Sequence, residues 1–499
     1  HAGNLSWAST DWVMLRGSAF TGDTQRTVIV NTSYVPKNST LPVLDYIPYH
    51  WKEIRSKYLL EERDDRSSDG NEDLLSVSQY TGVTKKRKQI SGSNDSRASS
   101  LEGYKQVDQD NLVINIMLAW NGSLGVSKYQ GIVSPAYGVY KINNVVYPTY
   151  LHYLVKSEEY KTLFRMYSTG VIDSRLRLYS DQLFSLRFIV PSYTEQEQIA
   201  HYLDYKNHLI NKYIRIKKKQ IELLKELKQA IINDAVKGKI DVRTGKPYPK
   251  YKDSGVDWLG MIPEGWSVKK LRNVATIKPS GVDKKTNASE RPVRLCNYTD
   301  VYKNEYIVPD MEFMEATVSE SEYNEYRLYK GDIIITKDSE MWNDIAVPSL
   351  ICQDIRDLVC AYHLCLIRIT NDCVTPEFIL RLLQAKTYQY QFHIAANGIT
   401  RFGVSKNTIK DALIAVPPKV TQNHLCDYLL SLCEKIETQI KTINSQIPYI
   451  KELQTRLVSD VVTGKLDVRE IEVPDFVEEL DVFEEDTFDD SMEEVVDAD

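Results

Sequence analysis

One long segment occurs twice in this sequence. Residues 191–243 align without a gap onto residues 417–469, which lie 226 positions further along the chain. About a third of the 53 paired positions are identical, from Pro191 and Pro417 to the Asp-Val-Arg tripeptides that close both copies. A match of this length indicates an internal duplication, so we expect the chain to fold as two related parts.

Both copies have the apolar spacing of a long helix. Apolar residues recur at intervals of seven, with partners three or four positions away. Two apolar stripes in one chain can bury each other, and the intervening sequence favours an antiparallel pair. The predicted pairing residues are Leu203, Ile210, Ile214, Ile221, Leu224 and Ile231 in the first copy and Leu429, Ile436, Ile440, Ile443, Ile447, Ile450 and Leu457 in the second.

A proline interrupts the helical pattern of the second copy. Pro448 lies where the first copy has Glu222. Proline has no backbone N–H and its ring clashes with the preceding turn. We therefore expect a kink or an interruption of the second helix at this position.

Weaker repeats precede each long helix. Ile47-Pro48 and Trp51 return as Ile262-Pro263 and Trp266, and further matches follow in the same order at offsets that drift from 215 to 228. They include Tyr80 with Tyr298, Asn121 with Asn343, Tyr137 with Tyr362, and Gly170 with Gly398. Such drift is what small loop insertions produce in a diverged repeat.

The repeats predict an α+β chain in which two similar mixed α/β domains alternate with two long helices paired as an antiparallel coiled coil. Residues 112–116 and 332–336 are typical of strands, and 150–156 and 378–384 of helices. The predicted parts are an unassigned extension at 1–44, a first mixed domain at 45–190, a central helix at 191–243, a connector at 244–265, a second mixed domain at 266–416, a distal helix at 417–469 and an acidic tail at 470–499.

Charge is distributed unevenly along the chain. The formal net charge is −7, and residues 470–499 hold fifteen acidic residues and no lysine or arginine. Removing fifteen negative charges from −7 leaves +8 for residues 1–469. Self-repulsion predicts a disordered tail, and the basic remainder favours a nucleic-acid partner.

Cysteine usage and hydropathy limit the class of protein. All seven cysteines lie in the second half of the chain, their number is odd, and no CxxC occurs, so neither a disulfide framework nor a standard zinc site is indicated. Cys352, Cys360, Cys365 and Cys373 surround His363 in an apolar run, which is more typical of buried thiols than of a metal site. Reduced thiols and the lack of an apolar run near ~18 residues favour a cytoplasmic protein without a membrane span.

Several stretches carry a family resemblance. They are KDSGVDWLG at 252–260, IPEGW at 262–266, LLSVSQY at 74–80, ANGITRFG at 396–403, and the proline and glutamine at both helix entries, Pro191 with Gln196 and Pro417 with Gln422. Over roughly residues 45–469 the sequence resembles the DNA specificity subunits of type I restriction-modification systems, which serve in phage defence.

This resemblance implies a division of labour. Two target-recognition domains would each read one half of a bipartite site in double-stranded DNA, held apart by the paired helices. Two modification subunits would carry S-adenosylmethionine and methylate adenine, and restriction subunits would use ATP and Mg to translocate and cut DNA. The chain itself would be non-catalytic and hold no cofactor. The sequence departs from the family at Asp110-Asn111, where Gly-Asp is expected, whereas Gly331-Asp332 keeps the pattern.

The densest basic cluster is Lys85-Lys86-Arg87-Lys88, followed by a Ser-, Asn- and Gly-rich stretch. A flexible basic loop suits contacts to DNA phosphates, which supply most of the affinity. The alternative is a solvated charged loop without a ligand.

Two glycine loops and two asparagines are further candidates for DNA contact. Gly170 with Arg175 and Arg177, and Gly398 with Arg401, combine a permissive backbone with guanidinium groups that suit a phosphate or a guanine edge. The alternative is a surface loop that closes on its own domain. Asn121 and Asn343 could meet an adenine edge, yet Trp-Asn after a strand more often caps a turn.

Catalytic motifs are absent from the sequence. There is no Asn-Pro-Pro-Tyr or Asp-Pro-Pro-Tyr tetrapeptide, no GxxxxGK[ST] loop and no HExxH. Two hypotheses remain: a DNA specificity subunit, and a coiled-coil scaffold that organises protein partners without sequence-specific DNA binding.

Overall fold

The computed structural model describes residues 34–79, 81–86, 101–172 and 175–476. The chain divides into two units, unit 1 with residues 1–214 and 448–499, and unit 2 with residues 215–447. Each long helix contributes one part to each unit. The mixed α/β fold with long helices is therefore confirmed.

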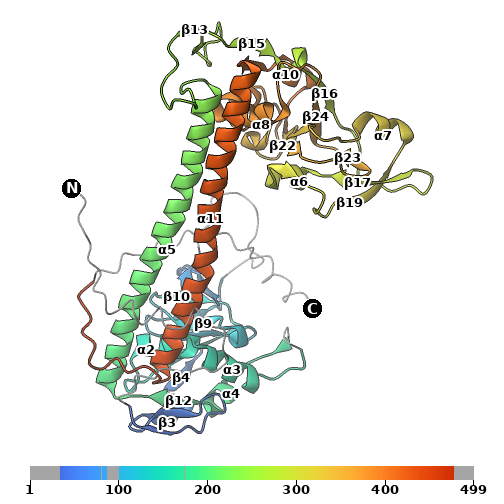
Figure 1. Cartoon of the computed structure of the whole chain (residues 1–499). Helices are drawn as coiled ribbons and strands as arrows, with labels where there is room; N and C mark the ends of the chain where they lie inside the picture. The colour runs from blue at the N-terminus through green and yellow to red at the C-terminus, as the bar shows by residue number, and fades with distance from the viewer. Residues whose placement is uncertain (1–33, 80, 87–100, 173–174, 477–499) are drawn as a thin grey trace. The chain divides into compact units, whose positions relative to one another are not determined.

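In its described residues the first mixed domain consists of short strands and short α-helices (Figure 1). In chain order its elements are β1 (Pro36–Asn38), β2 (Tyr46–Pro48), β3 (Lys52–Arg55), η1 (Ser56–Tyr58), β4 (Leu60–Arg63), β5 (Leu75–Ser78), β6 (Gly82–Lys85), β7 (Lys105–Val107), β8 (Leu112–Asn115), η2 (Ala119–Asn121), β9 (Leu124–Val126), β10 (Gly131–Val133), β11 (Tyr137–Ile142), α2 (Pro148–Lys156), α3 (Glu158–Tyr167), α4 (Ser180–Ser185) and β12 (Arg187–Val190).

The second mixed domain follows the same plan with additional elements. They are β13 (Tyr251–Asp253), β14 (Met261–Pro263), β15 (Ser267–Lys270), η4 (Leu271–Asn273), β16 (Ala275–Pro279), β17 (Arg291–Cys296), α6 (Tyr298–Lys303), β18 (Tyr306–Ile307), β19 (Met314–Val318), α7 (Glu320–Tyr326), β20 (Ile333–Thr336), β21 (Asp338–Ser339), η5 (Trp342–Asp344), β22 (Pro348–Ile351), β23 (Leu358–Cys360), β24 (Leu364–Ile369), α8 (Pro376–Gln384), α9 (Lys386–His393), β25 (Phe402–Gly403), α10 (Lys406–Asp411) and β26 (Leu413–Val416).

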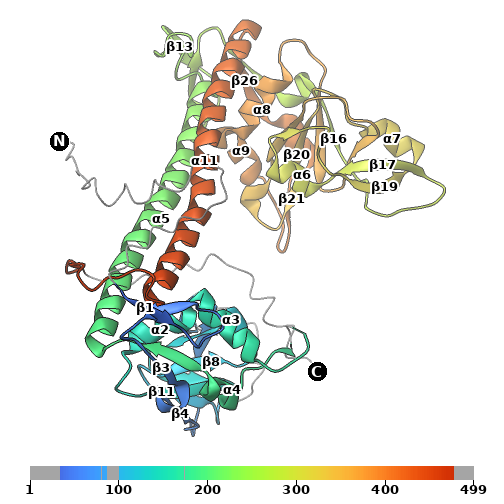
Figure 2. The same cartoon turned by 60° about the horizontal axis from the view of Figure 1, so that its bottom comes forward.

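The two mixed domains share one topology. Unit 1 has the antiparallel sheet order β4-β11-β8-β9, and unit 2 has β16-β24-β20-β22 with β18 added at the edge. Figure 2 labels β4, β8 and β11 of the first sheet and β16 and β20 of the second. In each unit the first strand after the entry turn pairs with the strand that leads into the long helix, β3 with β12 and β15 with β26. Helices α2, α3 and α4 correspond in order to α8, α9 and α10.

The central strand of each sheet separates two apolar clusters. In β8, Leu112 and Ile114 pack with α2 and α3, while Val113 packs on the β5–β6 side. In β20, Ile333 and Ile335 pack with α8 and α9, while Ile334 faces a second cluster around α6. Because alternate side chains of a strand point to opposite faces, a strand whose residues are all buried indicates a sheet covered on both sides.

The predicted boundary at residue 44 is wrong, because residues 36–44 belong to the first domain. β1 pairs with β2 as β13 pairs with β14, with Lys37 opposite Ile47 and Lys252 opposite Ile262. The intervening loops make the same backbone bonds, Ser39 N–H to Asp45 O and Ser254 N–H to Gly260 O. Residues 36–44 thus repeat part of the predicted connector. The sequence similarity is too weak to show this.

The long helices are shorter than predicted. Helix α5 spans Tyr193–Val236 and helix α11 spans Lys419–Val462, so neither reaches 243 or 469. Gly238 and Gly464 follow the helix ends with φ of +70° and +74°, a conformation that stops a helix. Each glycine also lies against a proline and a tryptophan of its own unit, Gly464 against Pro48 and Trp51.

Helix α11 passes through Pro448 without interruption. The proline side chain is exposed, and the helix continues to Val462. The prediction was a kink or an interruption, and the interruption is wrong because the helix is continuous. A missing backbone hydrogen bond is tolerated because the residues on both sides of Pro448 remain packed against α5.

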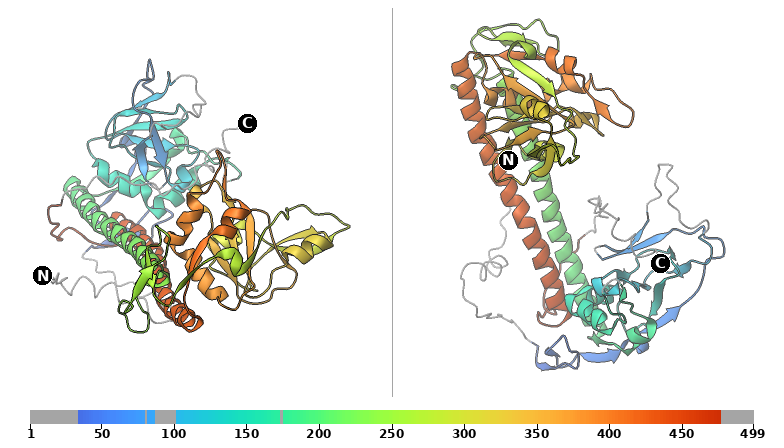
Figure 3. Two further views of the ribbon diagram at one scale, coloured as in Figure 1. Left: turned by 90° about the horizontal axis from the view of Figure 1, so that it is seen from above. Right: turned by 90° about the vertical axis from the view of Figure 1, so that its right-hand side faces the viewer.

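Within each unit the two long helices are in contact (Figure 3). In unit 2, Ile221 forms a buried cluster with Ile436, Ile440 and Ile443, against which Leu224, Ile231 and Ile447 pack. Lys228 Nζ binds Glu437 Oε1 at 2.8 Å. In unit 1, Gln454 Nε2 donates to Asn207 Oδ1 at 3.0 Å.

The other predicted pairing residues differ in their surroundings. Leu203 lies in the unit 1 core together with Val461, and Leu429 lies in the unit 2 core. Ile214 is buried, whereas Ile210, Ile450 and Leu457 are half-buried. The ends of the helices therefore pack into the mixed domains, and the middle parts contact each other.

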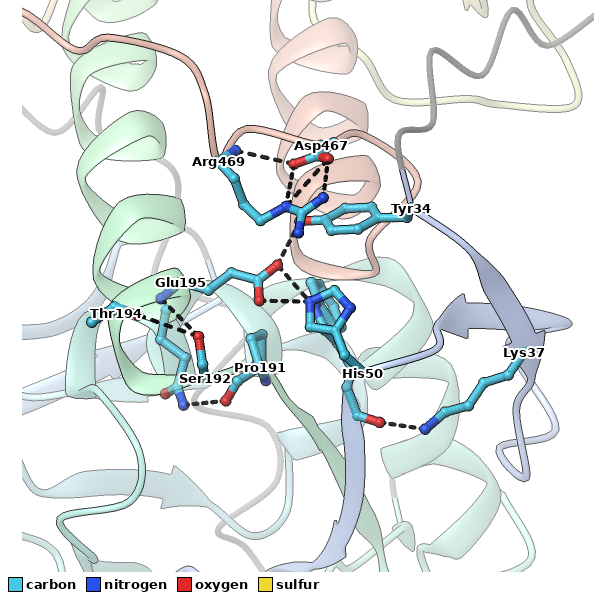
Figure 4. A network of polar contacts seen from close by, with 11 residues as sticks. Tyr34, Lys37, His50, Pro191, Ser192, Thr194, Glu195, Asp467 and Arg469 are labelled. Atoms are coloured by element: carbon cyan, nitrogen blue, oxygen red, sulfur yellow. Dashed lines mark hydrogen bonds and ion pairs between the residues drawn. The ribbon is translucent and has the colours of Figure 1, made fainter.

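The Glu195 carboxylate at the start of α5 bonds to side chains that precede β4, and the Asp467–Arg469 pair lies beside them (Figure 4). Buried Glu195 accepts hydrogen bonds from Tyr34 Oη at 2.6 Å and Trp51 Nε1 at 3.0 Å, and its second oxygen lies 2.9 Å from His50 Nε2. The Arg469 guanidinium stacks over the Tyr34 ring at 4.6 Å and pairs with Asp467. Burial, with the Glu195 carboxylate, raises the pKa of Tyr34.

The predicted tail begins later than residue 470. Gln198 Nε2 donates to the Ile471 carbonyl at 2.7 Å, and the Phe476 ring lies among His201, Tyr205 and His208 of α5. Residues 470–476 therefore lie on unit 1. The predicted disorder of 477–499 falls outside the described residues.

Candidate nucleic-acid interface

A polar cluster in unit 2 forms where β20 leads into β21. The Asp338 carboxylate contacts His363 Nδ1 and lies 3.1 Å from Arg401 Nε. Tyr298 Oη lies 3.1 Å from Ser339 Oγ, and Lys337 Nζ lies over the Tyr362 ring at 5.1 Å. We call Tyr298, Lys337, Asp338, His363 and Arg401 the β21 cluster.

The backbone brings the β21 cluster together from four segments. β21 pairs with β25, so that Asp338 lies opposite Gly403 and next to Arg401. His363 lies in the turn between β23 and β24 with φ of +72°, which directs its ring toward Asp338. Burial lowers the pKa of His363, against the opposing effect of the Asp338 carboxylate. Arg401 and Lys337 supply the cationic side chains of the cluster.

Exposed aromatic side chains surround the β21 cluster. Tyr298 and Tyr302 of α6 stack with ring centroids 5.6 Å apart and an interplanar angle of 14°. Tyr302, Trp342 and Tyr362 are exposed. Cations interleaved with exposed aromatic rings are typical of surfaces that contact nucleic acids.

The two glycine loops occupy equivalent places in the two domains. Thr169 and Arg177 exchange both backbone hydrogen bonds at 2.9 Å, and Asn397 and Gly403 do the same at 2.9 and 3.0 Å. Arg175 is exposed, and Arg177 is half-buried with Nη1 3.0 Å from the Leu176 carbonyl. Arg401 is about half exposed beside Asp338. The loops therefore offer Arg175 and Arg401 to a ligand more readily than Arg177.

The remaining predicted contacts have mixed surroundings. Lys85 lies at the end of β6, where its Nζ pairs with Asp73 at 2.6 Å, and Lys86 follows it on the surface. Arg87 and Lys88 lie outside the described residues. Asn121 Oδ1 accepts from the Ser123 N–H at 3.1 Å and from Ser123 Oγ at 2.8 Å, which favours turn capping. Asn343 is exposed in η5.

Lys156 connects two of these regions in unit 1. Its Nζ donates to the carbonyls of Gln79 at 2.7 Å and Gly122 at 3.2 Å, so the β5–β6 turn and η2 lie close together. The lysine charge is half-buried among carbonyls, and burial lowers its pKa to about 7.

Sequence reasoning did not find Tyr298, Lys337, Asp338 or His363 as site residues. Tyr298 and Tyr362 did stand out as repeated positions, which was the available signal. Asp338 lies in β21 and His363 lies 25 residues later in the turn between β23 and β24, and local patterns do not show that they meet. The described residues contain no group of three or more His, Cys, Asp or Glu arranged to hold a metal.

Comparison with known proteins gives a family match for the second domain and distant relatives for a longer part of the chain. Residues 263–448 match the family model described as type I restriction modification DNA specificity domain. The chain is 23% identical over 328 residues to the type I restriction enzyme EcoKI specificity subunit of Escherichia coli strain K12, covering 64% of this chain and 66% of that protein. It is 21% identical over 296 residues to the MjaVIII specificity subunit of Methanocaldococcus jannaschii, covering 58% of this chain and 64% of that protein.

These matches span slightly less than two thirds of the length of the two curated relatives. A solved structure described as the basis of complex assembly and conformational transition of the type I R-M system covers 84% of this chain and 99% of its own, with a TM-score of 0.60 and 12% identity. That similarity supports the fold. No helix in the described ranges is long and apolar enough to cross a membrane. Residues 263–448 therefore carry a type I restriction modification DNA specificity domain, and the chain over a longer range is similar to specificity subunits of type I restriction enzymes.

Proposed function

We propose that this chain reads a bipartite site in double-stranded DNA, one half with each mixed domain. The observation that carries this proposal is the repeated topology, in which both units place a glycine loop with an arginine at the same position. A repeated reader suits a site with two separate halves. In unit 2 the loop adjoins cations and exposed aromatic rings, which suits DNA contact.

The chain would act as a non-catalytic subunit that docks enzymes. Two modification subunits would bind S-adenosylmethionine and methylate the site, and restriction subunits would bind ATP and Mg. These partners belong to the proposal and follow from the similarity to type I specificity subunits.

We also propose that α5 and α11 pair as one antiparallel coiled coil. Within unit 2 later residues of α5 contact earlier residues of α11, as an antiparallel pair requires. Ile221 clusters with Ile443, and Lys228 pairs with Glu437. Within unit 1 Asn207 contacts Gln454. Such pairing would keep a constant gap between the two half-sites.

Selection from a random duplex pool tests this function. The chain, purified with and without modification subunits, is expected to recover two short fixed elements that flank a gap of constant length. Recovery of no bipartite consensus would contradict the proposal and favour a scaffold that organises proteins.

A matched pair of arginine variants locates the interface. Arg401→Ala is expected to weaken specific binding about tenfold and, if it contacts a phosphate, to reduce the salt slope by about one. Arg356→Ala is the control, because Arg356 is an exposed arginine of unit 2 that pairs with Asp357 away from the loop. Equal effects of the two substitutions would remove Arg401 from the interface.

A further inference from the structure

The glycine in each loop is fixed by close packing. Gly170 has φ of +147° and Gly398 has φ of +154°, where only glycine is comfortable. A Cβ atom on Gly170 would lie 2.4 Å from the Arg175 carbonyl oxygen, and one on Gly398 would lie 1.8 Å from that of Arg401. Each loop therefore folds tightly over its own glycine.

The residue after each glycine is a β-branched aliphatic side chain that points away from the protein. Val171 is 99% exposed and Ile399 is 98% exposed. A single exposed aliphatic residue is ordinary on a protein surface. Here a β-branched aliphatic residue follows the glycine in both loops, although the loops differ in length. Packing in a core does not explain this repeat, because neither side chain is buried.

The loop geometry suits insertion into a DNA groove. In unit 2 the two loop strands are joined at Asn397 and Gly403, so the tip is narrow. Arg401 lies two residues after Ile399 and is positioned by Asp338. A guanidinium beside an apolar tip could contact a phosphate while the tip reaches a base edge.

We propose that Ile399 and Val171 are base-reading residues that contact a thymine methyl group in the major groove. This rests on the proposed function. Neither side chain can donate or accept a hydrogen bond, and the thymine C5-methyl is the apolar group that distinguishes one base edge from the others in that groove. Each half-site should then contain a thymine that one loop reads.

The test uses the chain in complex with its modification subunits. Selection from random duplexes with Ile399→Ala should lose the preference for one thymine in one half-site, and Val171→Ala should lose one in the other half-site. Ile394→Ala and Val145→Ala are the controls, because both side chains are exposed aliphatics outside the loops.

Replacing the identified thymine with deoxyuridine removes only the methyl group. Wild-type affinity should fall about three- to tenfold, and the Ile399→Ala variant should not distinguish the two bases, as a double-mutant cycle shows. The salt slope should stay unchanged because no phosphate contact is lost.

An unchanged consensus in both loop variants, or a reduced salt slope, would overturn the inference. If the wild-type complex itself selects no bipartite site, the proposed function fails instead. The two failures are therefore distinguishable.

Discussion

Asp110 occupies a backbone conformation that normally belongs to glycine. Its φ is +64°, and the equivalent residue of unit 2 is Gly331 with φ of +87°. The following side chains bond in the same way, since Asn111 Oδ1 accepts from the Asp108 N–H and Asp332 Oδ2 accepts from the Tyr329 N–H. The turn is therefore the same in both units, although unit 1 has Asp110 where unit 2 has Gly331.

Substitutions at Asp110 should depend on backbone conformation. The left-handed region costs a residue with a Cβ roughly 1 kcal/mol more than glycine. Asp110→Gly is therefore expected to be about 1 kcal/mol more stable than Asp110→Ala in urea unfolding. The same pair at Gln109, which is exposed and has no positive φ, should show the opposite order. The same order of stability for the Gly and Ala variants at both sites would contradict this explanation.

Lys156 is a second residue whose surroundings decide its behaviour. Burial lowers its pKa from 10.5 to about 7, while its Nζ remains bonded to backbone carbonyls. Between about pH 7 and pH 10 the unfolded chain binds more protons at this lysine than the folded chain. Stability should therefore rise with pH in this range, and below pH 7 this residue adds no further slope.

Comparison with Lys156→Met isolates this contribution. The difference in unfolding free energy between wild type and variant should change by at most about 1.4 kcal/mol per pH unit above pH 7, in favour of wild type. Lys141→Met, at an exposed lysine of the same unit, is the control. A pH-independent difference for Lys156→Met would show that the amine is not desolvated.

At the scale of the element, Pro448 is a residue of low helix propensity inside helix α11. It is exposed, and it removes one backbone donor from a helix of 44 residues. Helix packing compensates for this loss, since Ile443 is buried against α5 in unit 2. Local propensity predicted an interruption, and tertiary contacts prevented it.

Restoring the missing donor should stabilise α11. Pro448→Ala is expected to raise the free energy of unfolding by about 1–3 kcal/mol, because proline in a helix interior costs about 3 kcal/mol relative to alanine. Thermal unfolding measures the change, with Ser445→Ala as a control at an exposed position one turn earlier. No gain would indicate that the helix already relaxes around the proline.

At the scale of the whole molecule, charge separates the chain into a basic body and an acidic end. Residues 477–499 contain twelve acidic residues and no lysine or arginine, so their removal changes the formal charge from −7 to +5. Truncation after Phe476 keeps the contacts of Gln198 and Phe476 with unit 1. Polyanionic DNA should then bind with less repulsion.

We expect this truncation to raise non-specific duplex affinity at low salt and to leave the selected consensus unchanged. A Gly/Ser segment of equal length in place of 477–499 separates charge from chain length, and salt titration of binding measures the effect. Unchanged non-specific affinity in both variants would show that the acidic end does not influence DNA binding.

Much of the architecture followed from repetition in the sequence. The 226-residue offset predicted two long helices, and the weaker echoes predicted two similar domains, because apolar spacing and duplicated order are local signals. The predicted helix ends were too late. The two copies still match at Asp-Val-Arg beyond Gly238 and Gly464, but the helices end before these glycines. The two glycine loops could also be located, because Gly170 and Gly398 are repeated, whereas DNA contact by their arginines stays a prediction.

The sequence by itself determined the duplication, the periodic helices and the separation of charge. Each of these follows from the order of residues along the chain or from residues that are close in sequence. Only the tertiary structure decided that Asp338, His363 and Arg401 meet, that residues 36–44 complete the first domain, and that Ile399 is fully exposed. The first depends on pairing of β21 with β25, two segments far apart in the chain, where contact is set by the packing of the whole unit and not by neighbouring residues. The other two depend on backbone pairing and exposure that the residue types alone do not specify.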